Sequence, residues 1–407
     1  MAPKYVICPH CAESRRRVDY LYVDPDGAVL TPPKREGVWT AVKGWNTPRQ
    51  PASSSMPMGT KRKCPGAKCG GLLSNELFKR ESRIVAVVGE SRSSKTAFLA
   101  AGVHQWRNGA YFTEMGISYN QFGEDDDLEN AIDRMFIEKY APGTTFAYQE
   151  GIQHKVIIIV ARTRRRREVN LVFIDVPGED LVDEVLMDRA AKFISRAQHI
   201  FILLTPMVAL DDRHSQMARA ILETEVVNRE TSSQEQRART GNIQSAAGSL
   251  KMINGIKEMQ GSDRIGGNQV GVSVILTKTD MLRALHDHPD YSELARGVIP
   301  PMHWLRTDTN GWVAADEKHG NVVDPTATAE MSERTRQLLA KMNPNLAEVI
   351  HQDFENPRYF AISASGGPGV AVEDGVRFHE VRPYRCIDPL IHMLTSIPAL
   401  RLAEGGR

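Results

Sequence analysis

Six short apolar runs, rich in β-branched residues, alternate with helix-capable stretches along most of this chain. Runs of this length and composition are typical of strands buried on both faces of a parallel sheet. The first run, 83–88, ends at Gly89, and the stretch 94–104 that follows it is typical of a helix. The other runs are 156–161, 171–175, 199–205, 272–277 and 358–363. This alternation predicts an α/β domain with a doubly wound, mostly parallel sheet.

Two features of the connections refine this prediction. An arginine-rich turn joins 156–161 to 171–175, so these runs predict a hairpin that contributes one antiparallel strand. The connections at 207–270 and 283–357 are too long for simple crossovers, and we expect them to be insertions. Within the first insertion, the polar segment 229–248 is expected to be a mobile loop.

Composition changes near residue 80. Residues 1–80 are rich in proline, glycine and basic side chains, and 47–60 is loop-like. We therefore expect an N-terminal module over 1–80 and the α/β domain over 81–407. The whole chain is 41% apolar and 25% charged, and its formal charge of +1 argues against a protein that works mainly as a polyelectrolyte.

The N-terminal residues lack the apolar stretch of a secretion signal, and no run of about eighteen apolar residues occurs. We therefore expect a cytoplasmic protein without a membrane span. Cysteine usage agrees, because four of the five cysteines form two closely spaced pairs, Cys8 with Cys11 and Cys64 with Cys69. In a reducing compartment such pairs favour metal binding over disulfides. The isolated Cys386 has apolar neighbours and is expected in the core.

The two cysteine pairs look like the two knuckles of a zinc ribbon. Four thiolates saturate tetrahedral Zn²⁺ and can fold a segment that is too small to stabilise itself. The gap between the pairs is longer than usual, and the second pair is wider than C-x-x-C. Four unligated thiols in a flexible arm are therefore the alternative. Because four cysteines suffice without His10, the predicted zinc is structural.

The sequence at 88–96, V-G-E-S-R-S-S-K-T, follows the phosphate-loop pattern G-x-x-x-x-G-K-[ST] except that Ser94 replaces the second glycine. It lies between a predicted strand and a predicted helix, as the motif requires. Backbone N–H groups would hold the β-phosphate, Lys95 would bridge the β- and γ-phosphates, and Thr96 would ligate Mg²⁺. An ordinary polar turn is the alternative. The nucleotide-binding residues predicted here are Gly89, Ser91, Arg92, Ser93, Ser94, Lys95 and Thr96.

Two further motifs end apolar strands. In D-V-P-G, the Asp175 carboxylate can hold Mg²⁺ through water, and the Gly178 N–H can contact a γ-phosphate. In T-K-T-D, which begins at Thr277, the Asp280 carboxylate can accept hydrogen bonds from N1–H and the exocyclic amine of guanine. Adenine lacks donors at both positions, so the residue predicts selectivity for guanine. The aliphatic stem of Lys278 can cover the base. Taken singly, each motif is also a common strand-end turn.

The triplet Ser363-Ala364-Ser365 follows the last run, where a backbone N–H can donate to guanine O6. All four motifs thus occur in order, each at the carboxyl end of a strand, which is the edge where open α/β sheets bind ligands. Together they resemble the P-loop GTPases of the translation-factor-related (TRAFAC) class over about 82–405. The variant phosphate loop, the D-x-P-G and a preceding G-T-T are similar to bacterial double-GTPase-like proteins, which are encoded with multi-component signalling or conflict systems.

This resemblance implies a switch threonine before the second strand, whose hydroxyl completes the Mg²⁺ shell in the triphosphate state. Thr144 and Thr145 both fit that position, and 110–150 would be the first switch. Glu179 stands where Ras-like enzymes place a water-orienting glutamine, so the sequence supports nucleotide binding more directly than hydrolysis. The catalytic residues implied are Lys95, Thr144, Thr145, Gly178 and Glu179.

These motifs predict a Mg²⁺-dependent switch that binds GTP and GDP, hydrolyses GTP and signals to a protein partner through nucleotide-ordered loops. The alternative is a slow or inactive GTPase-like scaffold that recruits protein or nucleic acid. Basic clusters at 15–17, 61–63 and 164–167 lack interleaved aromatic residues and a nucleic-acid-binding fold. A solvated surface is therefore favoured over a nucleic-acid contact.

Overall fold

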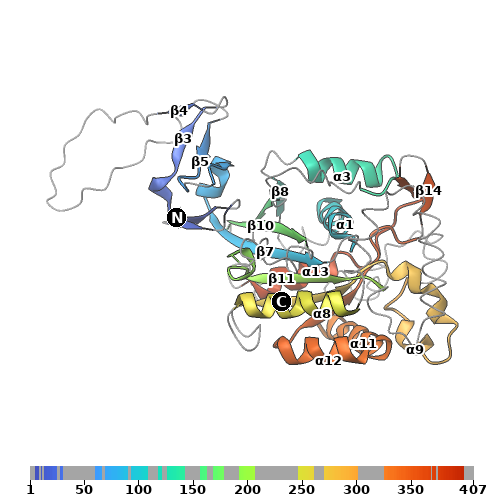
Figure 1. Ribbon diagram of the computed structural model, residues 1–407. Helices are drawn as coiled ribbons and strands as arrows, with labels where there is room; N and C mark the ends of the chain where they lie inside the picture. The colour runs from blue at the N-terminus through green and yellow to red at the C-terminus, as the bar shows by residue number, and fades with distance from the viewer. Residues whose placement is uncertain are drawn as a thin grey trace, which may run out of the picture.

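A computed structural model of the chain places a seven-stranded sheet at its centre, with helices on both faces (Figure 1). No helix of the described part is both long and apolar enough to cross a bilayer. The residues that the structure describes are 5–8, 11, 13–24, 28–30, 60–66, 69–89, 93–108, 118–121, 126–142, 156–162, 168–177, 192–206, 246–260, 270–300, 325–367, 369–372 and 375–397.

The sheet confirms the predicted α/β class. Its strands, in spatial order, are β13 (Arg358–Ala361), β12 (Gly271–Leu276), β11 (His199–Leu204), β7 (Glu81–Gly89), β10 (Glu168–Pro177), β9 (Val156–Arg162) and β8 (Ser118–Gln121). The first five run parallel to one another, and β9 is antiparallel to both of its neighbours. Each predicted apolar run forms a strand, and β9 with β10 forms the predicted hairpin. The edge strand β8 was not predicted, because S-Y-N-Q carries no apolar run.

Helices cover both faces because residues alternate in direction along each strand. On β7, Ile84, Ala86 and Val88 join one core, whereas Val85 and Val87 join the other. The first core lies under α8 (Ala246–Gln260), α11 (Pro325–Met342) and α12 (Pro344–Asp353), and the second lies under α1 (Lys95–Asn108), α3 (Asp126–Phe136) and α13 (Asp388–Ser396). Each fully buried aliphatic side chain of these cores contributes about 1.5–3 kcal/mol.

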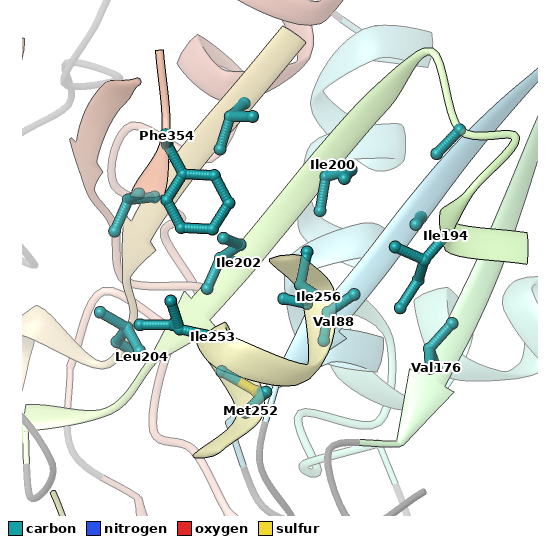
Figure 2. Packing of buried hydrophobic residues seen from close by; sticks show 14 of the residues in the cluster. Val88, Val176, Ile194, Ile200, Ile202, Leu204, Met252, Ile253, Ile256 and Phe354 are labelled. Carbon is teal, nitrogen blue, oxygen red and sulfur yellow. The ribbon is translucent and has the colours of Figure 1, made fainter. Parts of the chain in front are cut away.

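Figure 2 shows the first core at close range, where α8 packs across the central strands. Met252, Ile253 and Ile256 of this helix lie against Ile200 and Ile202 of β11, and all five are at most 1% exposed. This spacing of apolar residues explains why the segment is helical. The helix begins at Ala246, inside the segment 229–248 that was predicted to be a loop. That prediction is wrong for 246–248, and 229–245 lies outside the described residues.

Both predicted insertions contain regular structure. The first contributes α8, and the second contributes η6 (Thr279–His286, which begins before the expected bound), α9 (Ser292–Ala295), α11 and α12. The stretch predicted to be the first switch, 110–150, contains β8 and α3. A small hairpin of β14 (Val370–Val372) and β15 (Gly375–Arg377) follows β13.

The N-terminal residues form short strands around a small core. A hairpin of β1 (Tyr5–Ile7) and β2 (Ser14–Arg16) is followed by the short helix η1 (Arg17–Asp19). A four-stranded sheet comes next, with its strands in the order β4 (Val29–Leu30), β3 (Leu21–Val23), β5 (Lys61–Lys63) and β6 (Leu72–Leu73). The short helix η3 (Asn75–Phe78) then leads into β7. The buried Arg62 guanidinium lies over the rings of Tyr22 and Phe78, 4.3 and 4.1 Å from their centroids. This core is continuous with the first core of the large sheet.

Candidate nucleotide site and metal centre

The carboxyl ends of the five parallel strands lie level at one edge of the sheet. Gly89, the last residue of β7, pairs with Pro177 of β10 and with Leu203 of β11. The strands β11 and β12 also end together, and Leu276 of β12 pairs with Ala361 of β13. Because each motif directly follows or ends one of these strands, the register brings all of them to the same edge.

Close packing requires glycine at position 89. A Cβ atom on Gly89 would lie 2.5 Å from Ser93 Oγ, 2.9 Å from Leu203 Cβ and 3.0 Å from the Leu203 carbonyl oxygen. Ser93 therefore lies close against the end of β7 and is only 1% exposed. A phosphate loop needs such close packing, since its backbone must approach the ligand closely.

Ser94 has a left-handed backbone, with φ of +65°. This is the position where the phosphate-loop pattern has glycine, and glycine adopts that conformation at little cost. The helix α1 begins at the next residue, and the N–H of Phe98 donates to the Ser94 carbonyl at 2.8 Å. The serine therefore keeps the backbone geometry of the motif, at a cost on the order of 1–3 kcal/mol.

Lys95 folds back over the loop. Its Nζ donates to the Gly89 carbonyl oxygen at 2.8 Å and lies 4.0 Å from Asp175 Oδ1 at the end of β10. The side chains are 8% and 18% exposed, so a cation and a carboxylate meet in a largely desolvated place. Thr96 follows, half-buried in the first turn of α1. This arrangement offers a cation for phosphates, with a hydroxyl and a carboxylate for Mg²⁺.

The T-K-T-D turn is anchored to strands on both sides. The N–H and hydroxyl of Thr277 both donate to the Leu204 carbonyl, at 2.8 and 3.1 Å. The N–H of Thr279 donates to the carbonyl of Ile362, just after β13, at 3.1 Å. Between these two anchors Lys278 adopts a left-handed backbone with φ of +51°. The turn therefore has a fixed geometry.

Asp280 is buried beside the loop that follows β13. The Ser363 hydroxyl donates to Asp280 Oδ1. Burial raises the pKa of Asp280, while the Ser363 hydrogen bond and the charge of Arg283 oppose that rise. The N–H of Ser363 donates to the Tyr384 carbonyl at 3.1 Å, so the predicted backbone donor to guanine O6 is assigned to the next residue, Ala364. Sequence reasoning did not identify Arg283, although its position three residues after Asp280 on η6 could have suggested a contact.

The structure brings the described residues of the predicted nucleotide site together in two groups, or halves. One half contains Gly89, Ser93, Ser94, Lys95, Thr96 and Asp175, and the other contains Thr277, Lys278, Asp280, Ser363 and Ala364. The predicted residues Ser91, Arg92, Thr144, Thr145, Gly178 and Glu179 lie outside the described residues.

The four cysteines of the N-terminal residues meet in one cluster, as expected of a metal site. All four sulfur atoms lie within 4.8 Å of one another, with Cys8 Sγ 3.7 Å from Cys69 Sγ and Cys11 Sγ 3.9 Å from Cys64 Sγ. Tetrahedral Zn²⁺ with Zn–S bonds of about 2.3 Å separates its sulfur ligands by about 3.8 Å. A disulfide would need about 2.05 Å. The sulfur spacing therefore fits a zinc ion.

Backbone turns hold the cysteines in this arrangement. The N–H of Cys8 donates to the Glu13 carbonyl at 3.0 Å, and the N–H of Cys64 donates to the Gly71 carbonyl at 2.9 Å. Burial raises the pKa of the Cys11 thiol to about 11, so a bound cation would be needed to hold it as a thiolate at neutral pH. The buried Cys386 lies apart from the cluster, in the second core, as predicted.

Comparison with known proteins adds little to this geometry. No protein-family model matches the sequence, and no curated protein matches it. Among solved structures, Sup35 complexed with GMPPNP aligns at 11% identity and a TM-score of 0.25, over 72% of this chain and 41% of that chain. Sup35 complexed with GDP aligns at 10% identity and a TM-score of 0.24, over 73% and 41%. This chain thus spans about two fifths of the Sup35 chains, and the functional assignment has to rest on the site itself.

Proposed function

We propose that this chain is a guanine-nucleotide switch of the P-loop GTPase type, which binds GTP with Mg²⁺ and hydrolyses it. The observation that carries the proposal is the left-handed Ser94 between the tightly packed Gly89 and the buried Lys95. Other non-glycine residues of the described chain, such as Lys278, also have a left-handed backbone, so the conformation counts here because of its place: Ser94 stands at the second glycine position of the motif, directly before Lys95 and α1. The level strand ends then add Asp175 on one side and Asp280 on the other.

Each residue of the phosphate half has a distinct role in this proposal. Lys95 would exchange its bond to the Gly89 carbonyl for the β- and γ-phosphates, and the N-terminus of α1 would face the same anion. The Thr96 hydroxyl and the Asp175 carboxylate would hold Mg²⁺, Asp175 through water. The switch threonine, Thr144 or Thr145, and the pair Gly178 and Glu179 would respond to the γ-phosphate, as the sequence motifs predict. A protein partner would recognise the ordered state of these same loops.

The base half gives the nucleotide preference. Asp280 would accept the two guanine donors, the Lys278 stem would cover the ring, and the N–H of Ala364 would donate to guanine O6. A slow or inactive scaffold remains the second candidate, because the cost of the left-handed Ser94 weakens the loop relative to glycine. Single-turnover hydrolysis, measured beside nucleotide affinity, separates the two candidates. Tight GTP binding without turnover would identify the scaffold.

The test of nucleotide binding uses Lys95→Ala, with Lys251→Ala on the exposed side of α8 as the matched control. Loss of the Lys95 cation should remove most affinity for a non-hydrolysable GTP analogue, because Lys95 is the side-chain cation that would offset the β- and γ-phosphate charge. Thr96→Ala should weaken binding mainly when Mg²⁺ is present, since its hydroxyl acts through the metal. Calorimetric titration measures all three variants. Wild-type affinity in Lys95→Ala would contradict the proposal.

A further inference from the structure

Arg283 belongs to a closed ring of contacts around Asp280. It lies three residues after Asp280 on η6, and its Nη2 donates to the carbonyl of Gly366 in the loop after β13. The same loop returns to Asp280, because the Ser363 hydroxyl donates to Asp280 Oδ1 and accepts the Gly366 N–H at 2.9 Å. Gly366 has a left-handed φ of +75°, which turns its carbonyl and N–H in these directions.

The guanidinium acts on the Asp280 carboxylate at a distance. It bonds to the Gly366 carbonyl, and no hydrogen bond joins the two described side chains of Arg283 and Asp280. The Arg283 charge therefore favours the ionised carboxylate without occupying its lone pairs. Ser363 uses one acceptor site, whereas an ionised carboxylate offers about four. Acceptor sites thus remain for two donors on one edge of a base.

We propose that Arg283 is a positioning residue for guanine recognition, because its bond to the Gly366 carbonyl holds the loop 363–367 that in turn contacts the Asp280 carboxylate. This inference rests on the proposed nucleotide function and deepens it. A direct Arg283–Asp280 ion pair would compete with the base for the carboxylate. The observed bond to Gly366 instead leaves the carboxylate available while the charge stays near.

The charged and titratable groups that face Asp280 define the expected pH dependence. They are Arg283 on η6, Lys278 at its start and the Cys386 thiol from the segment before α13. Burial raises the pKa of Cys386 well above its usual value, so this thiol adds no charge at neutral pH. Among the described residues, removal of Arg283 would leave Lys278 as the remaining cation that acts on Asp280, and it would raise the pKa of Asp280 further. Guanine affinity would then fall, on acidification, at a higher pH than in the wild-type protein.

The experiment titrates the full chain with fluorescent GTP and with fluorescent ATP, in the presence of Mg²⁺, at several pH values between about 5.5 and about 8. It compares Arg283→Gln, Arg283→Lys and the matched control Arg296→Gln, whose side chain is exposed after α9. In Arg283→Gln, GTP affinity should fall roughly tenfold at the acid end and less at the alkaline end. ATP shares the phosphates but lacks the guanine donors, so its affinity should not change.

Arg283→Lys keeps the charge and loses the guanidinium geometry, so it should retain the wild-type pH profile with a partial loss of GTP affinity. Equal behaviour of Arg283→Gln and Arg296→Gln at every pH would overturn the inference. An equal loss of GTP and ATP affinity would overturn it too, because that result would mean a general collapse of the site. Failure of the wild-type protein to bind GTP at all is a distinct result, which would overturn the proposed function as well.

Discussion

Ser94 carries a backbone conformation that a serine adopts only at a cost, with φ of +65° directly before α1. Replacement by glycine should relieve this cost and raise stability, nucleotide affinity or both by about 1 kcal/mol in total. The measurement is the free energy of unfolding together with calorimetric affinity for a GTP analogue. Ser94→Ala is the matched control, because it removes the hydroxyl but keeps a Cβ in the left-handed backbone.

A gain in Ser94→Gly without a gain in Ser94→Ala would identify backbone strain as the cause. A loss of affinity in Ser94→Gly would mean that the hydroxyl itself binds the ligand. The sequence shows the missing glycine but not the torsion angle, so the structure was needed to show that the loop keeps the left-handed geometry. Gly89 is the converse case, since its contacts with Leu203 depend on the register of β7 and β11.

At the scale of elements, the parallel strands were predictable because each is a short apolar run that is buried on both faces. The edge strand β8 was not, because its polar residues pair with β9 only once the hairpin exists. The start of α8 was misread as loop because the polar residues before it hide the apolar spacing of Met252 and Ile256. Local composition therefore predicts the central elements better than those at the edges.

The buried His199 joins β11, β12 and α13, and it predicts a pH dependence of stability. Its Nδ1 lies 3.0 Å from Ser396 Oγ, and its Nε2 lies 2.9 Å from Ser273 Oγ. The Ser396 hydroxyl donates to the Met393 carbonyl at 2.8 Å, so it accepts from His199 Nδ1–H. The Ser273 hydroxyl then donates to Nε2. This pattern fixes a neutral imidazole.

Burial, and then the neighbouring His392, lowers the pKa of His199 well below its usual value, and burial lowers that of His392 to about 4. The unfolded chain therefore binds protons first, at about pH 6.5, so stability is complete above that pH and falls on acidification. We expect a slope of up to about 1.4 kcal/mol per pH unit for each histidine. Urea unfolding between neutral pH and about pH 5 measures this slope.

His199→Gln cannot gain a proton in this range, so its unfolding free energy should depend less steeply on pH than that of the wild-type protein. His351→Gln, exposed on α12, is the control and should keep the wild-type slope. Identical slopes in all three proteins would contradict the prediction, because they would show that His199 does not contribute to the pH dependence of stability.

Across the whole molecule, β7 connects the cysteine cluster with the proposed nucleotide site. Its first residue follows the N-terminal elements, and its last residue, Gly89, is the first residue of the proposed phosphate loop. The buried residues Val6, Tyr20 and Phe78 belong to the same core as Ile84 on β7. The two ends of this nine-residue strand are about 26 Å apart. We therefore expect loss of structure at the cysteine cluster to disturb the packing of the shared core more than the geometry at Gly89.

We predict one zinc ion per chain, held by Cys8, Cys11, Cys64 and Cys69, which elemental analysis of freshly purified, reduced protein can measure. Cys64→Ser should lose the metal and lower the thermal midpoint, because the N-terminal core depends on a metal link between its two cysteine turns. Cys386→Ser is the control, since it removes a buried thiol of the second core and should keep the zinc. Affinity for a GTP analogue should change less than about twofold in Cys64→Ser, because the phosphate loop is at the far end of β7. Unchanged zinc content in Cys64→Ser, or no metal in the wild-type protein, would show that the four sulfur atoms cluster without an ion.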